Sequence, residues 1–161
     1  MGFSKFLNSS LKLNIILIIS FSISVNSFIL FPSVNNSFYV LFHLTFIYLT
    51  FYYYHYYLYV VALVYGILFD ILLLNYIGAH LITFLSLLIF FVLLKKYLIR
   101  LSSYQIIFIY FITLIALLLF EQLLANLIND YKFNMFLILN FFVISLIIFI
   151  PTIFLFNKLD K

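Results

Sequence analysis

Ionisable side chains are rare in this chain, and those that interrupt its apolar runs are the candidates for chemistry. Asp70 is the clearest, because it lies within an apolar run one helical turn after Gly66. A carboxyl at the centre of a bilayer costs about 2.5 to 3.5 kcal/mol on insertion scales, so Asp70 needs a specific local partner. Two interpretations stay open: a buried carboxyl that bonds to a neighbouring helix, or a site for a partner or ligand.

The other ionisable residues give weaker signals. Glu121 could pair with Asp70 across two helices, although its place near a predicted helix end favours simple solvation. His43 and His55 have no potential metal ligand at a useful spacing, and we interpret them as structural or interfacial histidines. The chain contains no HExxH sequence or glycine-rich phosphate loop, and no Ser-His-Asp arrangement is suggested by spacing. The sequence therefore predicts no catalytic residue, no cofactor site and no metal site.

The composition indicates whether the segments that carry these residues lie in water or in lipid. Of the 161 residues, 68% are hydrophobic and 7% are charged, whereas a soluble domain carries about 25% charged residues. There are too few polar side chains to cover a surface that faces water, so most of the surroundings must be lipid. Cysteine is absent, which excludes disulfides and thiolate chemistry. The net charge of +4 comes from basic residues scattered between apolar runs, which is typical of membrane flanks rather than of a nucleic-acid interface.

The apolar runs predict a single membrane domain over residues 1–161. Runs of about 20 residues match a hydrocarbon core of about 30 Å, and the alternating pattern of a barrel strand is missing. A secretory signal is the alternative for the first run, but that run is longer than a signal core and no cleavage site follows it. The fold class is therefore all-α: a polytopic integral membrane protein with a bundle of six transmembrane helices. The expected helices are 11–31, 36–54, 57–76, 79–98, 104–125 and 135–156.

Two stripes of small residues indicate close helix packing. Each stripe repeats at positions i, i+4 and i+7, which lie on one helix face and let two helices approach closely. The alternative is that the hydroxyls bond to carbonyls of their own helix. The stripes are Ser20, Ser24 and Ser27 in the first run, and Ala79, Thr83 and Ser86 in the fourth.

The basic residues predict an orientation. Of the eight Lys and Arg residues, Lys132 alone falls on one side of the six-span arrangement, and the other seven fall on the opposite side. The positive-inside rule then places both termini in the cytoplasm and Asp70 toward the outer face. Lys95, Lys96 and Arg100 follow the fourth run, and we expect them to anchor to anionic membrane lipid, at about 1 kcal/mol each.

The segment from Gly66 to Gly78 reads G-I-L-F-D-I-L-L-L-N-Y-I-G, a G-x3-D-x7-G pattern between two spans. The pattern resembles that of the bacterial rod shape-determining protein MreD family. The following helix with its basic end, the chain length and the multi-span layout are also similar to that family. One departure is Leu73-Leu74, where the family often has a small residue. The resemblance implies a fold similar to the six-helix substrate-binding (S) components of energy-coupling-factor transporters.

The same resemblance implies a non-catalytic component of the cell-elongation complex that directs peptidoglycan synthesis at the bacterial inner membrane. The implied partners are an MreC-like bitopic protein and, beside it, an MreB-like filament, a RodA-like polymerase and a penicillin-binding transpeptidase. The family motif matches Gly66, Asp70 and Gly78, and our docking hypothesis adds Asn75 and the first-run stripe at Ser20 and Ser24. The alternative is the substrate-binding membrane subunit of a vitamin transporter, in which Ser20 and Ser24 would dock a coupling subunit.

Overall fold

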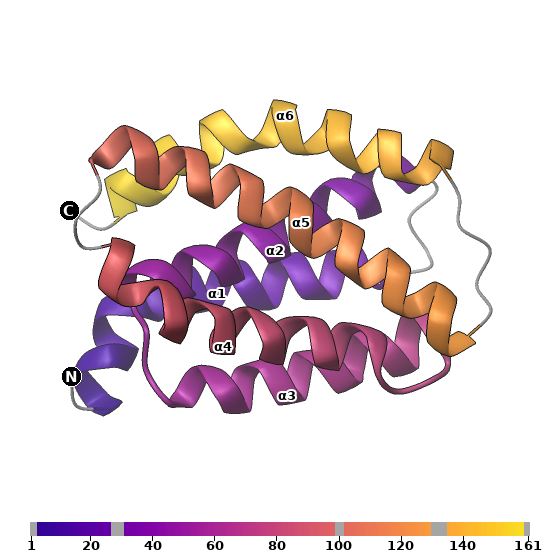
Figure 1. Cartoon of the computed structure of the whole chain (residues 1–161), viewed down its shortest axis with the longest axis horizontal. Coiled ribbons are helices and arrows are strands. Elements are labelled where there is room, and N and C mark those ends of the chain that lie inside the picture. Colours follow the sequence, from indigo (N-terminus) through magenta and orange to yellow (C-terminus); the bar gives the residue numbers. More distant parts are fainter. Residues whose placement is uncertain (1–2, 27–30, 99–101, 130–134, 160–161) are drawn as a thin grey trace. The chain divides into compact units, whose positions relative to one another are not determined.

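A computed structural model describes residues 3–26, 31–98, 102–129 and 135–159, and the chain is helical almost throughout these ranges (Figure 1). Asn26 and the segment 53–56 are among the described residues outside helices. The helices are α1 (Phe3–Ser24), α2 (Pro32–Tyr52), α3 (Tyr57–Phe69), the π-helical turn η1 (Asp70–Leu74), α4 (Ala79–Leu98), α5 (Ser103–Asn129) and α6 (Met135–Leu159). The fold is therefore all-α, as the composition and the lack of strand periodicity predicted.

The helices form two compact units. Unit 1 comprises residues Met1–His55 and Met135–Lys161, and in it α2 packs against α1 and α6. The segment from Phe42 to Thr50 of α2 is buried, as expected of a helix that is apolar on every face. Unit 2 comprises Tyr56–Asn134, in which α3 and α4 form an antiparallel hairpin and α5 packs against α4. Unit 2 holds the residues on which the candidate site is built.

In the part of the chain that the structure describes, four helical segments are long and apolar enough to cross a bilayer. They are Tyr57–Leu74, Ala79–Leu98, Tyr104–Ile128 and Met135–Phe156, and Leu11–Ser24 forms a shorter apolar segment. Hydroxyl groups inside them bond to carbonyls of their own helices: Thr83 Oγ1 donates to Ala79 at 2.7 Å and Thr113 Oγ1 donates to Ile109 at 2.8 Å. These bonds satisfy polar groups where lipid could not.

The observed helix limits agree best with the sequence in the fourth run, where α4 spans the predicted 79–98. The first run differs most, because α1 begins at Phe3 and ends at Ser24 rather than spanning 11–31. Pro32 does not end this helix but begins the next, since proline has no N–H to leave unpaired in a first turn. The segment 33–35, which lies between the expected helices 11–31 and 36–54, therefore belongs to α2. Helix α5 extends to Asn129, beyond the predicted end at 125.

Candidate functional site

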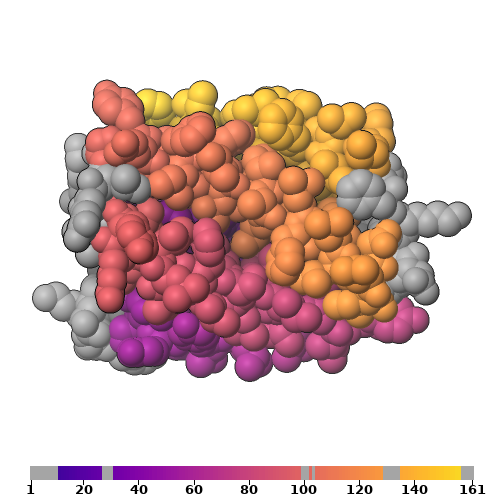
Figure 2. Space-filling model, in the orientation of Figure 1, coloured from indigo at the N-terminus to yellow at the C-terminus, as the bar shows by residue number. Residues whose placement is uncertain are grey.

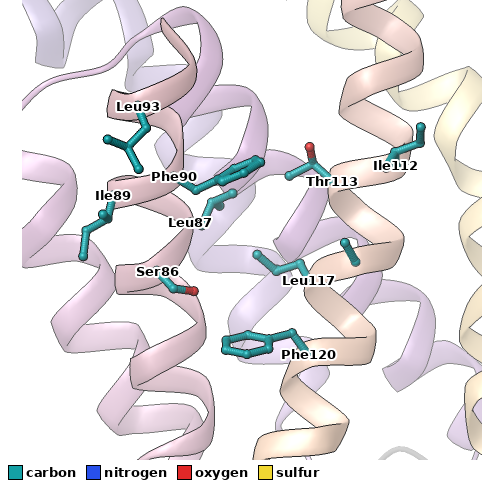
Figure 3. A pocket seen from close by; sticks show the side chains of 10 residues that line it. Ser86, Leu87, Ile89, Phe90, Leu93, Ile112, Thr113, Leu117 and Phe120 are labelled. Carbon is teal, nitrogen blue, oxygen red and sulfur yellow. The ribbon is translucent and has the colours of Figure 1, made fainter.

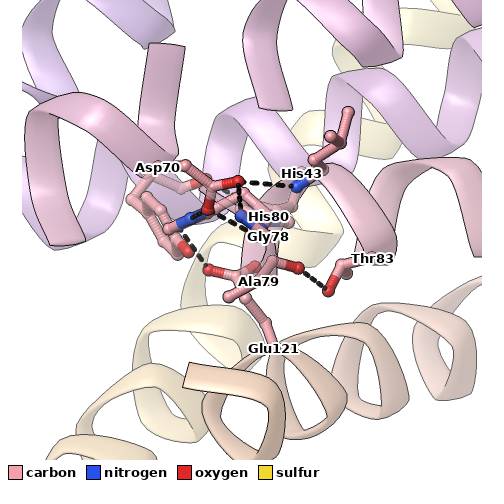
Figure 4. Close-up of polar contacts among 9 residues, drawn as sticks. His43, Asp70, Gly78, Ala79, His80, Thr83 and Glu121 are labelled. Atoms are coloured by element: carbon pink, nitrogen blue, oxygen red, sulfur yellow. Dashed lines mark hydrogen bonds and ion pairs between the residues drawn. The ribbon is translucent and has the colours of Figure 1, made fainter. Parts of the chain in front are cut away.

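Asp70 caps the N-terminus of α4. Its Oδ2 accepts the backbone N–H of Gly78 at 2.7 Å and that of Leu81 at 3.3 Å, and its Oδ1 accepts the backbone N–H of His80 at 2.8 Å (Figure 4). The first N–H groups of a helix have no partner within the helix, and the helix dipole favours a negative charge there. Asp70 is fully buried. The first interpretation of this carboxyl, a bond to a neighbouring helix, is therefore the arrangement that the structure shows.

The local sequence explains why the cap comes from so far back in the chain. Gly78 precedes α4 and has no side-chain oxygen, although its carbonyl accepts the first helical bond, from the Ile82 N–H at 2.9 Å. The end of the preceding helix brings Asp70 into range. The π turn Asp70–Leu74 widens the helix, and Asn75 ends it in the left-handed region at φ 59°, where asparagine is tolerated better than most residues. Gly78 has φ 150°, a conformation that glycine adopts without strain.

Gly66 brings α3 and α4 into close contact. A Cβ atom at this position would lie 2.7 Å from the Cα of Leu81 and 3.1 Å from its backbone nitrogen. Only a glycine fits so close to another backbone. Gly66, Asp70 and Gly78 thus all serve the same feature, the hairpin between α3 and α4.

His80 links Asp70 to α5. Its Nδ1 lies 2.8 Å from Asp70 Oδ1, and its Nε2 lies 2.8 Å from Glu121 Oε1 (Figure 4). The imidazole stacks on the Phe69 ring, with centroids 5.3 Å apart and planes 17° apart. His80 is 3% exposed and Glu121 is 2% exposed. The result is a buried carboxyl–imidazole–carboxyl chain, which we call the Asp70–His80–Glu121 chain.

The hydrogen-bond geometry limits where protons can lie in this chain. Each of the two nitrogen–oxygen contacts requires one proton between its atoms. Asp70 already accepts backbone N–H groups as a carboxylate does, so the proton of the first contact belongs to His80 Nδ1. The proton of the second contact belongs either to Nε2, giving an imidazolium and a carboxylate, or to Glu121, giving an imidazole and a carboxylic acid. Both arrangements carry the same single net negative charge.

The sequence anticipated part of this chain. A pairing of Asp70 with Glu121 was one expectation, and the structure brings them together through His80 rather than in direct contact. His80 was not among the predicted site residues, although it is an ionisable residue two positions after the motif glycine Gly78. The expectation that Glu121 is solvated near a helix end was wrong. Because α5 continues to Asn129, Glu121 lies two turns inside the helix.

The other residues predicted as docking or anchoring sites are not members of the Asp70–His80–Glu121 chain. Asn75 is exposed on the α3–α4 connection. Ser20 and Ser24 belong to α1 of unit 1 and are buried. Ser24 Oγ donates to the Phe21 carbonyl at 2.8 Å, as the self-bonding alternative predicts, whereas the buried Ser20 Oγ has no hydrogen-bond partner among the described residues. Lys95 and Lys96 are exposed in the last turn of α4. Two predicted members, Ser27 of the stripe and Arg100 of the basic cluster, lie outside the described residues.

The Asp70–His80–Glu121 chain differs from the Asp–His pairs that are common in catalytic and metal sites. In a catalytic triad the Nε2 atom faces a nucleophilic hydroxyl or thiol. Here the Glu121 carboxyl occupies that position, so the imidazole has an acid on each side. Asp70 and Glu121 lie on different nitrogens of the ring rather than converging on one point. Within the described ranges, no group of three His, Asp or Glu residues is placed to hold a metal ion.

A second feature of unit 2 is an apolar groove between α4 and α5, two helices that lie on the face shown in Figure 2. Its volume is about 480 Å³. Figure 3 shows side chains of the two helices that line it, among them the small residues Ser86 and Thr113. Ala116 is a third small residue of the lining. The larger residues are Leu87, Ile89, Phe90, Leu93, Ile112, Leu117 and Phe120. We call this feature the α4–α5 groove.

Comparisons with protein-family models, with curated proteins and with solved structures found no match to this chain.

Proposed function

We propose that this protein is a non-catalytic membrane component of a bacterial cell-elongation complex, similar to MreD, which binds the transmembrane helix of an MreC-like bitopic partner. The observation that carries the proposal is the α4–α5 groove, an apolar groove that small residues hold open on a helical membrane domain. Helices associate in lipid by close packing at small residues, since burial of apolar surface gives no advantage there. In this proposal a single transmembrane helix of the partner packs along the groove.

The G-x3-D-x7-G motif supports the family resemblance through its structural role. Gly66, Asp70 and Gly78 all act in one feature: the first allows close helix contact, the second caps α4, and the third donates to that cap. A motif that fixes a helix hairpin suits a protein whose function is to present a surface. Gly66 and Asp70 are buried against α4, so we assign them to the shape of the hairpin and the direct docking role to the α4–α5 groove.

In this proposal the chain crosses the bacterial inner membrane six times, with both termini in the cytoplasm. The four long apolar helices support four of the crossings, and α1 and α2 supply the other two. Lys95 and Lys96 then lie at the cytoplasmic surface, where anionic lipid attracts them. The Asp70–His80–Glu121 chain lies toward the outer face. The MreB-like filament, the RodA-like polymerase and the penicillin-binding transpeptidase are further members of the proposed complex.

Filling the groove tests the docking role. Ala116→Phe places a large ring among the small residues of the groove, and we expect it to reduce co-purification of an MreC-like partner from membranes at least tenfold. The matched control is Leu123→Phe, which adds a ring on the same helix at a half-exposed position outside the groove lining. The control should retain the partner. Equal recovery of the partner with both variants would show that the groove is not the docking surface.

A further inference from the structure

We propose that His80 and Glu121 share one exchangeable proton, and that this proton holds α5 against the α3–α4 hairpin. The inference is independent of the proposed partner and rests on the geometry of the Asp70–His80–Glu121 chain. Intramembrane ionisable residues are rare and commonly mark proton pathways or binding sites. Here three of them form one line, each within 2.8 Å of the next.

The first step concerns Asp70, which holds the His80 ring in place. Asp70 accepts three backbone N–H groups from the start of α4 and the Nδ1–H of His80. These contacts hold its negative charge and fix the ring, since the imidazole also stacks on Phe69. The ring and its proton on Nδ1 are therefore constant features of the hairpin. The Nε2 atom is presented to α5 in one orientation.

The second step concerns the contact between His80 Nε2 and Glu121, whose proton can be lost. With one proton between Nε2 and Glu121 Oε1, α5 bonds to the hairpin at 2.8 Å, and the chain carries one negative charge. Without that proton, the lone pair of Nε2 faces a carboxylate and two negative charges share a buried site. The contact then changes from attractive to repulsive. Loss of the proton should therefore separate α5 from α4, and its return should restore the contact.

The other charged groups among the described residues of unit 2 do not offset this change. On η1 the group that faces the ring is Asp70, and on α5 it is Glu121. Within the described part of the unit, the cationic side chains are Lys95 and Lys96, in the last turn of α4, whereas His80 lies in its first turn. Tyr76, on the connection between η1 and α4, is 63% exposed.

The separation of α4 and α5 can be measured directly because the chain contains no cysteine. Spin labels at Ile89→Cys and Ile112→Cys, both about half exposed on opposite sides of the groove, report the distance between the helices in the full-length protein in lipid nanodiscs. As pH rises, the ratio of separated to joined states should increase about tenfold per pH unit, as for release of one proton. The population at the short distance should return when the pH is lowered.

The decisive variant is Glu121→Gln. A glutamine amide donates to Nε2 as a protonated carboxyl does, but it cannot lose that proton, so the labels should stay at the short distance at every pH. The control Gln122→Leu changes the next residue of α5 and should keep the response of the unaltered chain. If Glu121→Gln does not fold, His80→Gln, which also lacks a titrating ring, should give the same flat profile. A distance that does not change with pH in the unaltered chain would overturn the proposal. So would a response that persists in Glu121→Gln or, where that variant does not fold, in His80→Gln.

Discussion

Asp70 Oδ1 accepts both the backbone N–H and the ring Nδ1–H of His80, each at 2.8 Å. One oxygen atom thus fixes the start of α4 and the orientation of the imidazole that α4 carries. Because the two contacts share an acceptor, any substitution of Asp70 disturbs both the helix cap and the Asp70–His80–Glu121 chain. The helix hairpin and its buried polar chain form one structural feature.

Asp70→Asn should destabilise the protein. The variant keeps one carbonyl oxygen, but its amide group would face backbone N–H donors that need an acceptor. Leaving buried donors unsatisfied costs about 1 to 3 kcal/mol. We expect a loss of this size in unfolding experiments in detergent micelles. Tyr76→Phe, at an exposed position on the same connection, should change stability by less than about 0.5 kcal/mol. Equal stability of Asp70→Asn and the parent chain would show that the cap contributes nothing.

Gly66→Ala should also destabilise the protein, although alanine is the better helix former. The new Cβ would meet the Leu81 backbone at 2.7 Å, so α3 and α4 would have to separate. Overpacking of this kind costs about 1 to 3 kcal/mol. Val64→Ala, at a position of α3 that is 45% exposed, is the control and should be nearly neutral in the same unfolding experiment. A stabilised Gly66→Ala variant would mean that helix propensity outweighs the contact.

Asn75 gives a test of backbone conformation alone. Its φ of 59° is unfavourable for residues with an ordinary side chain, at about 1 to 2 kcal/mol. Asn75→Ala should therefore lower the unfolding midpoint, while Asn75→Gly should preserve or raise it. Because Asn75 is exposed, neither change removes a packed side chain. The reverse order of the two variants would contradict the left-handed helix end.

Much of the fold follows from patterns that operate over a few residues. The helical class follows from apolar runs without strand periodicity, and the limits of α4 follow from Gly78 before it and from Lys95 and Lys96 in its last turn. The α1–α2 boundary was harder, because Pro32 can either follow a helix or begin one, and the flanking residues decide between the two. Here Asn26 lies outside α1, and Pro32 occupies the first turn of α2.

The candidate site was harder to predict from the sequence, because it includes a contact between residues that are far apart along the polypeptide. The Asp70 cap and the Gly66 contact lie within one hairpin, and the motif spacing indicated both residues. Glu121 comes from a different helix, and its contact with His80 depends on how α5 packs against α4. No local pattern encodes that packing. A histidine at the start of an apolar helix was the one signal that could have pointed to the chain.

The most direct test of the account is a double-mutant cycle between Asp70→Asn and Glu121→Gln, measured as free energy of unfolding in detergent micelles. The Asp70–His80–Glu121 chain predicts that the two changes are non-additive by about 0.5 to 3 kcal/mol, because both act on the same imidazole. In a His80→Phe background the coupling should fall to within about 0.5 kcal/mol of zero. Additive effects in the protein that retains His80 would contradict the account, since Asp70 and Glu121 would then not be coupled through the ring.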